Sequence, residues 1–277
     1  MIVNGIADLR RYCPAVIISE DRDTFDDAIA VAEDLVEHDI LGAALHAALE
    51  EAREDTPLRI RAARAIALQA FHGKISSVDV VLHDTGFGVE NSEAFQAASR
   101  TRIEALKENT QRERDDAFST LVARLMESVE YEAWRLTPQF QALNGGLVNT
   151  LAEFRHFAVP TPESREVMPQ RWEDFVDIRT KMVDALYGMV APRTGMALVE
   201  AMKQRIRERT LPPQWQQALF LMKWVVVNRP LGNEGIAEMY LARLLDYLAA
   251  NAEAFPEYVV PDATARERKN QAVMNFL

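Results

Sequence analysis

The chain has 277 residues, of which 48% are hydrophobic and 26% are charged, a balance typical of globular rather than disordered proteins. Its formal net charge of −11 argues against a nucleic-acid backbone as principal partner, because such binding needs clustered lysine and arginine. The single cysteine, Cys13, excludes an intrachain disulfide, and no run approaches the ~18 apolar residues of a membrane span. We therefore expect a chain that folds without disulfide bonds, in a reducing compartment.

Three helices are predicted before residue 75 from apolar residues at helical spacing. Thr24 is the expected N-cap of the first, and the second carries its apolar stripe between residues 41 and 52. Thr56 and Pro57 open the third, with proline at the first helical position, and Gly73 ends it. The predicted buried stripe of this third helix consists of Ile60, Ala63, Ile66, Ala67, Ala70 and Phe71.

A β-hairpin is predicted around residues 78–89, where valine-rich segments flank the turn Asp84-Thr85-Gly86. It is the one convincing β signal in the sequence. A long helix is then expected to run to about Trp134, although residues 107–116 are entirely polar. If it is continuous, ~40 residues at about 1.5 Å each would extend about 60 Å. Such a helix would either project from the protein or span between its two halves.

The second half is also predicted to be helical, from about residue 137 to 255. Thr150 and Glu153 have the spacing of a capping box, and Pro212-Pro213 opens an apolar helix. We therefore divide the chain into four segments: a first helical unit with the hairpin (1–91), a long connecting helix (92–136), a second helical unit (137–255) and a loosely ordered tail (256–277).

The two halves resemble each other. Gly42-Ala-Ala-Leu45 in the first half matches Gly195-Met-Ala-Leu198 in the second. In both halves a helix precedes this motif and a proline-started apolar helix follows it. Coincidence among helices rich in alanine and leucine is the alternative. The predicted fold is therefore mainly α, with two similar small helical bundles joined by a long helix and one hairpin.

Two short motifs suggest chemistry, but a structural reading is favoured for each. Asp84-Thr85-Gly86 matches the aspartic-protease triplet, yet that chemistry needs two copies, and the same residues are ordinary in hairpin turns. Glu153 and His156 have the spacing of a di-iron ligand pair, but no second such pair exists. The sequence therefore predicts no catalytic residue, no cofactor and no metal site.

Successive blocks of the sequence resemble a family of Bacteroidetes phage and prophage structural proteins of uncharacterised function, almost from end to end. The blocks are NGIADLRRYCPA, DILGAALHAAL, RIRAARAIALQAF, VVLHDTGFGVENSEAFQAASRTRIEALK, LNGGLVNTLAEFRHF, FVDIRTKMVDALYGMVAPRTGMALVEAM and LPPQWQQALFLMKWVVVNRPL. More distantly, the first-half plan is similar to the small helical head-tail connectors of tailed phages, which form rings between portal and tail. This chain is longer than those connectors, and its second half shows no clear hairpin.

The resemblance implies a virion structural protein that assembles with copies of itself and with phage portal or tail proteins, in the host cytoplasm and then in the virion. It implies no cofactor. The expected assembly residues lie in the hairpin and the long helix: Val80, Leu82, Phe87, Val89, Phe95, Ile103 and Leu106. The alternatives are a host helical adaptor unrelated to virions and, less favoured, a metal-dependent enzyme using Glu153, His156 or Asp84.

Overall fold

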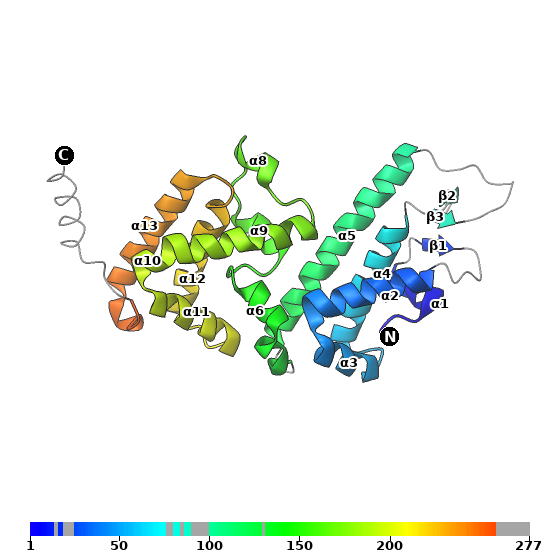
Figure 1. Cartoon of the computed structure of the whole chain (residues 1–277), viewed down its shortest axis with the longest axis horizontal. Helices are drawn as coiled ribbons and strands as arrows, with labels where there is room; N and C mark the ends of the chain where they lie inside the picture. Colours follow the sequence, from blue (N-terminus) through cyan, green and yellow to red (C-terminus); the bar gives the residue numbers. More distant parts are fainter. Residues whose placement is uncertain are drawn as a thin grey trace. The chain divides into compact units, whose positions relative to one another are not determined.

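A computed structural model describes residues 1–13, 16–18, 25–75, 80–83, 86–89, 100–128 and 131–258 (Figure 1). The protein is mainly helical, and its contacts divide it into two units. Unit 1 comprises Met1–Leu143, Asn149–Glu153 and Pro169–Phe175, and unit 2 comprises Asn144–Val148, Phe154–Met168 and Val176–Leu277. No helix in the described part of the chain is both long and apolar enough to span a membrane.

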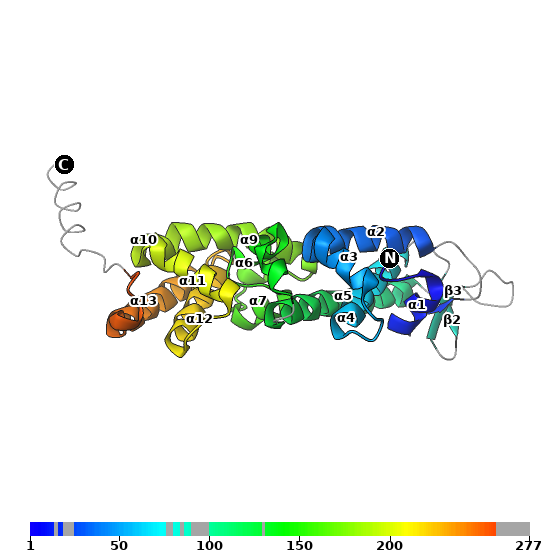
Figure 2. The same ribbon diagram turned by 90° about the horizontal axis from the view of Figure 1, so that it is seen from below.

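Unit 1 is built around α4. Its elements are α1 (Gly5–Tyr12), β1 (Val16–Ile18), α2 (Asp26–Val36), a π-helical turn η2 (Glu37–Leu41), α3 (Ala43–Glu51), α4 (Pro57–Lys74), β2 (Val80–His83), β3 (Gly86–Val89), α5 (Arg100–Glu127), η3 (Glu132–Leu136), α6 (Pro138–Asn144) and α7 (Leu151–Phe157), of which α6 and α7 end in unit 2. Helices α1, α2, α3 and α5 all contact α4, and Figures 1 and 2 show α4 alongside α5.

Helix α4 is buried on several sides, which explains its composition. It begins as predicted, with Pro57 in the first turn after an extended Thr56. The predicted stripe from Ala63 to Phe71 is buried, but Ile60 is 38% exposed, and the prediction for it was wrong. Additional small residues, including Ala62 and Ala65, are fully buried. Alanine at these positions lets neighbouring helices approach closely on more faces than one amphipathic stripe provides.

Helix α5 is shorter than the predicted helix, because it ends at Glu127 and a 3₁₀ segment follows at Glu132–Leu136. It belongs entirely to unit 1, where Phe118, Leu121 and Leu125 are fully buried. The indole Nε1 of Trp134, in the 3₁₀ segment, donates a hydrogen bond of 2.7 Å to the carbonyl oxygen of Ile40. The segment after α5 therefore turns back onto the π-helical turn of the same unit.

A three-stranded sheet, in the order β1-β3-β2, completes unit 1. Strands β2 and β3 lie in the region of the predicted hairpin and pair antiparallel, with Val80 opposite Val89 and Leu82 opposite Phe87. Strand β1 pairs with β3 in parallel, and the sequence pattern did not predict it. Three residues are too short for a periodic signal, and a parallel partner far along the chain is visible only in the tertiary structure.

Every secondary-structure element among the described residues of unit 2 is a helix or a helical turn. It contains α8 (Ser164–Val167), most of α9 (Trp172–Ala185), a π-helical turn η4 (Leu186–Val190), α10 (Ala191–Thr194), α11 (Met196–Glu208), α12 (Pro213–Asn228), α13 (Glu234–Ala250) and η5 (Ala252–Ala254). Helices α12 and α13 form its main packed pair (Figure 2). The core includes Met182, Leu198, Met222 and Leu241, all fully buried.

Candidate functional site

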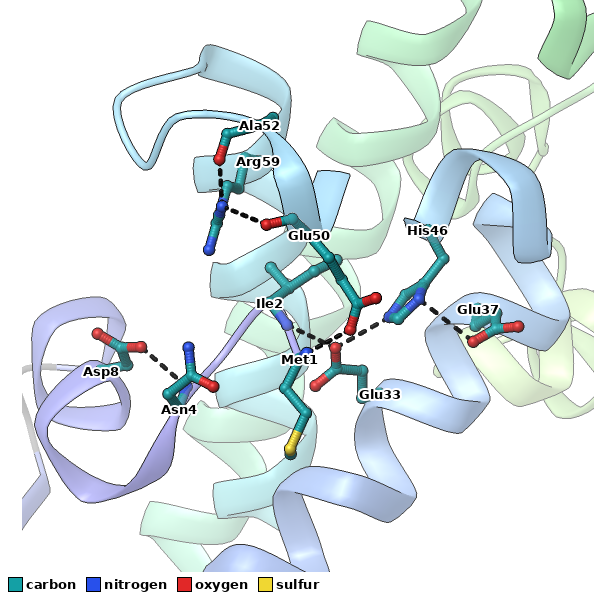
Figure 3. Close-up of polar contacts among 10 residues, drawn as sticks. All are labelled: Met1, Ile2, Asn4, Asp8, Glu33, Glu37, His46, Glu50, Ala52 and Arg59. Carbon is teal, nitrogen blue, oxygen red and sulfur yellow. Dashed lines mark hydrogen bonds and ion pairs between the residues drawn. The ribbon is translucent and has the colours of Figure 1, made fainter. Parts of the chain in front are cut away.

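A cluster of titratable side chains lies where α2 meets α3 in unit 1 (Figure 3). Glu33 comes from the buried face of α2, and His46 and Glu50 lie one turn apart on α3. Glu33 is 4% exposed and His46 is 8% exposed, whereas the side chain of Glu50 is 36% exposed. The cluster therefore has two buried members and one member that reaches solvent.

Hydrogen bonds connect the members of the cluster. His46 Nε2 lies 2.9 Å from Glu33 Oε1, and His46 Nδ1 lies 3.4 Å from Glu37 Oε2. The backbone N–H of Ile2 donates to the same Glu33 oxygen at 2.6 Å, and the α-amino group of Met1 forms an ion pair with Glu50 (Figure 3). The N-terminal segment is thus held against α2 and α3 by two carboxylates.

The end of α3 that carries Glu50 is held in place by Arg59 of α4. Its Nη1 donates to the backbone carbonyl of Glu50 at 2.9 Å and also to that of Ala52. Carbonyls at a helix C-terminus lack partners within the helix, so a guanidinium placed there satisfies them. The position of the Glu50 backbone is consequently fixed from outside α3.

The charges in the cluster are only partly balanced. A hydrogen bond from the Met1 ammonium lowers the pKa of the Glu50 carboxyl, and the positive charge of that ammonium adds to the effect. The second carboxylate oxygen of Glu33, Oε2, is buried and has no hydrogen-bond partner. A buried carboxylate oxygen is costly unless a donor or a cation reaches it. The cluster is therefore an electronegative site that is suited to a cation.

One ligand atom from each of Glu33, His46 and Glu50 lies within 4.8 Å of the other two. Among the described residues this is the one group of three such side chains close enough to hold a metal ion. The sequence reasoning missed it. The i, i+4 spacing of His46 and Glu50 was visible in the sequence, but nothing there placed Glu33 beside them.

The acid-base candidates chosen from the sequence lie elsewhere. Asp84 is outside the described residues. Glu153 caps α7: its carboxylate accepts from the Asn149 N–H at 2.8 Å, and its own N–H donates to Thr150 Oγ1 at 3.0 Å. His156 is exposed and packs its ring edge-on against Phe157 at 4.9 Å. The structure therefore gives Glu153 a capping role, which is the role that the sequence spacing predicted.

The assembly candidates are distributed over strands and helix. In the pairing of β2 with β3, Val80 is opposite Val89 and Leu82 is opposite Phe87, so the four residues occupy alternate positions along the two strands. Phe95 lies outside the described residues. On α5, Ile103 is partly exposed, whereas Leu106 is 6% exposed and packs inside unit 1. Leu106 thus has little surface to offer a partner.

A second buried ionic group lies on α5. Arg114 pairs with Asp115 at 2.7 Å and with Glu173 at 2.9 Å, and it donates to Gln69 of α4 at 3.2 Å. The side chains of Arg114 and Asp115 are only 3% exposed. Burial is the main cause that raises the pKa of Asp115, while the Arg114 charge lowers it. These pairs allow a polar stretch of α5 to lie inside unit 1.

Unit 2 carries an open hollow of about 750 Å³ between the η4 turn and the start of α13. Its lining includes Arg193, which pairs with Glu238 through two hydrogen bonds of 2.5 and 3.1 Å, and Arg229, which pairs with Glu234. Both guanidinium groups are thus engaged within the unit.

Comparison with known proteins gives one match. A family of unknown function (DUF6712) matches residues 23–142 and 231–268, together more than half of the chain. The chain belongs to this family. The first matched segment contains Glu33, His46 and Glu50, so the α2-α3 cluster lies within the family region. No curated protein and no solved structure matches the chain.

Proposed function

We propose that this member of the DUF6712 family is a virion structural protein of a phage or prophage, acting as a head-tail connector or adaptor ring component through protein-protein assembly. The sequence blocks that resemble such a structural family are one support. The observation that carries the proposal is a repeated backbone plan in the two units. A chain that contains two related but different bundles offers two different faces, as a closed ring of heterologous contacts requires.

The repeat is detailed enough to favour duplication of one ancestral unit. In unit 1, α2 ends in a π-helical turn, Gly42 follows with φ 74° and ψ 153°, and α4 begins at Pro57 after α3. In unit 2, α9 ends in a π-helical turn, the short helix α10 follows, Gly195 adopts φ 94° and ψ 137°, and α12 begins at Pro213 after α11. Because π-helical turns are rare, their placement before equivalent glycines supports a common origin.

Both units then add a long helix against the proline-started helix. Helix α5 packs on α4 in unit 1, and α13 packs on α12 in unit 2. The predicted hairpin region lies between α4 and α5, whereas a short turn at Arg229–Gly232 joins α12 to α13. The two bundles thus differ most at this connection, and we propose that the apolar hairpin positions Val80, Leu82, Phe87 and Val89 form the docking element of unit 1.

Large exposed apolar side chains support an assembly role. Val31 and Leu136 in unit 1 are 66% and 70% exposed, and Met196 and Phe220 in unit 2 are 53% and 40% exposed. Single exposed apolar residues are common on monomers, so these positions indicate where to test for contacts rather than define an interface.

The oligomeric state tests the proposal. The full chain is expressed alone and together with portal and tail-proximal proteins from the same genome, and native mass spectrometry and negative-stain microscopy follow. A ring of several copies, alone or on the portal, is expected. A strictly monomeric chain at high concentration that also fails to bind the portal and tail proteins would contradict the proposal.

The second candidate is a helical adaptor of the host, unrelated to virions. The neighbouring genes distinguish a connector from a host adaptor. Portal, capsid and terminase genes are expected beside a connector, and their absence from every genome that carries a family member would favour the adaptor.

A further inference from the structure

We propose that Glu33, His46 and Glu50 bind a divalent transition-metal ion, with Zn²⁺ as the preferred test ion. The site is separate from the proposed docking residues, because its three members lie on α2 and α3 and not in the hairpin region or on α5. One imidazole and two carboxylates form a ligand set that suits Zn²⁺ and related first-row ions.

The ligand atoms are close to the required spacing. Around a tetrahedral ion with bonds of about 2.0 to 2.2 Å, neighbouring ligand atoms lie about 3.4 Å apart. His46 Nε2 and Glu33 Oε1 are 2.9 Å apart, and all three ligand atoms lie within 4.8 Å of one another. Glu50 is the exposed member, so its side chain has room to move toward the other two. The two buried members need little movement.

A separate observation points to a cation. Glu33 Oε2 is buried without a hydrogen-bond partner, on a residue that is only 4% exposed. In Figure 3 one oxygen of this carboxylate points toward the Ile2 nitrogen and His46, and the other lies on the side of Met1. A metal ion bound to this carboxylate would compensate the charge on the oxygen that no protein donor reaches.

The surroundings of the three residues resemble those that orient metal ligands elsewhere. A metal-bound histidine usually donates its second ring N–H to a carboxylate, and His46 Nδ1 lies 3.4 Å from Glu37 Oε2. Glu33 Oε1 is held by the Ile2 N–H, and the end of α3 is held by Arg59. These contacts fix the side chains of Glu33 and His46 and the backbone of Glu50 before an ion arrives.

The Met1 ammonium already places one positive charge on Glu50. A metal ion would replace that ammonium as the partner of Glu50 and would bind the lone pair of His46 Nε2, so that any proton on this nitrogen would pass to solvent. Binding therefore exchanges a monovalent cation for a divalent one among several carboxylates, which is electrostatically favourable.

The test uses the full chain, freed of its purification tag and treated with chelator. Calorimetric titration with ZnCl₂ alone is expected to show one ion per chain, confirmed by elemental analysis, and to raise the thermal unfolding midpoint. Glu50→Gln, at an exposed position, is expected to fold as the parent does and to weaken binding by about tenfold or more. His46→Gln is expected to abolish binding.

His38→Gln is the matched control. His38 also lies beside a carboxylate, with Nδ1 2.8 Å from Asp39 Oδ1, but it is outside the cluster. It is expected to leave binding unchanged. The proposal is overturned if the parent chain binds no stoichiometric Zn²⁺, if Glu50→Gln binds as tightly as the parent, or if His38→Gln removes the binding. None of these results bears on ring formation.

Discussion

The junction of α2 and α3 in unit 1 and the junction of η4 and α11 in unit 2 share a backbone but not a chemistry. Both contain a π-helical turn and a glycine at positive φ, but Gly42 follows its turn directly, whereas the short helix α10 lies between η4 and Gly195. Glu50 and Lys203 follow their glycines at the same distance in sequence, yet one is acidic and the other basic. Lys203 Nζ donates to Tyr187 Oη at 2.9 Å, and that hydroxyl donates to Glu200 at 2.7 Å.

The two junctions have the π-helical turn and the glycine in common, whereas the side chains around them differ in charge. In unit 1 they leave an uncompensated acidic site, and in unit 2 they form a neutralised chain of hydrogen bonds. If the units do fold around separate cores, changes in one should leave the other intact.

The largest effect is expected from the buried tryptophans. Trp134 in unit 1 and Trp215 in unit 2 are each 2% exposed and donate to a backbone carbonyl. Trp134→Ala should destabilise unit 1 by about 4 kcal/mol through the lost contacts and the cavity. Hydrogen exchange followed by mass spectrometry should show faster exchange in unit 1 alone, and Trp215→Ala should show the reverse. Exposed Leu136→Ala is the control, and equal acceleration in both units would contradict separate cores.

The next largest effect is expected when Gly42 or Gly195 is replaced by alanine. Alanine at residue 42 or 195 must adopt positive φ with extended ψ, a region almost confined to glycine. Each substitution should cost about 2 to 3 kcal/mol in urea unfolding. At residue 42 a Cβ would also lie 2.9 Å from Gln139 Oε1, the movable end of a side chain, so the backbone conformation should account for most of the loss. Gly73→Ala in α4, where a Cβ meets nothing within 4 Å, should be neutral or slightly stabilising. If Gly42→Ala lowered the free energy of unfolding no more than Gly73→Ala does, backbone strain at residue 42 would be ruled out as the cause.

A smaller effect should appear with pH in unit 1. Burial lowers the pKa of His72 to about 4, aided by the positive charges of Arg114 and Lys107. Between its ordinary value of about 6.5 and 4, the unfolded chain binds the proton and the folded chain does not, so stability falls as the pH falls through this window and then levels off. After allowance for partial exposure, the loss should be about 1 kcal/mol. Urea unfolding at pH 7 and pH 4.5 measures it, and His72→Gln should reduce this loss. An unchanged pH dependence in the variant would refute the assignment.

The smallest effect concerns the ion pairs at the surface of each unit. Arg193 and Glu238 of unit 2 share two hydrogen bonds, whereas Arg11 and Glu54 of unit 1 share one and are more exposed. Arg193→Gln should cost about 0.5 kcal/mol at low salt and less at high salt, and Arg11→Gln should cost almost nothing. Thermal unfolding at two salt concentrations measures both. A larger loss at Arg11 would mean that geometry does not decide the strength of these pairs.

Helical spacing, proline and capping residues in the sequence were enough to predict the mainly helical fold. They also located the starts of α4 and α7, at Pro57 and after Thr150, because these signals act within one or two turns of the chain. They failed for Arg114 and Asp115, which lie in a stretch that the sequence marks as polar and are buried in the structure. Apolar periodicity detects hydrophobic burial, but it cannot detect a charge that is buried with a partner.

The sequence by itself determined that the chain is mainly helical and where α4 and α7 begin, since those choices depend on neighbours a few residues apart. Only the tertiary structure decided that Glu33 meets His46 and Glu50, that β1 joins β3, and that Trp134 reaches Ile40. Each of these contacts joins residues from different elements. Their distance depends on how the helices pack, and that packing is set by the whole core rather than by any local pattern of residues.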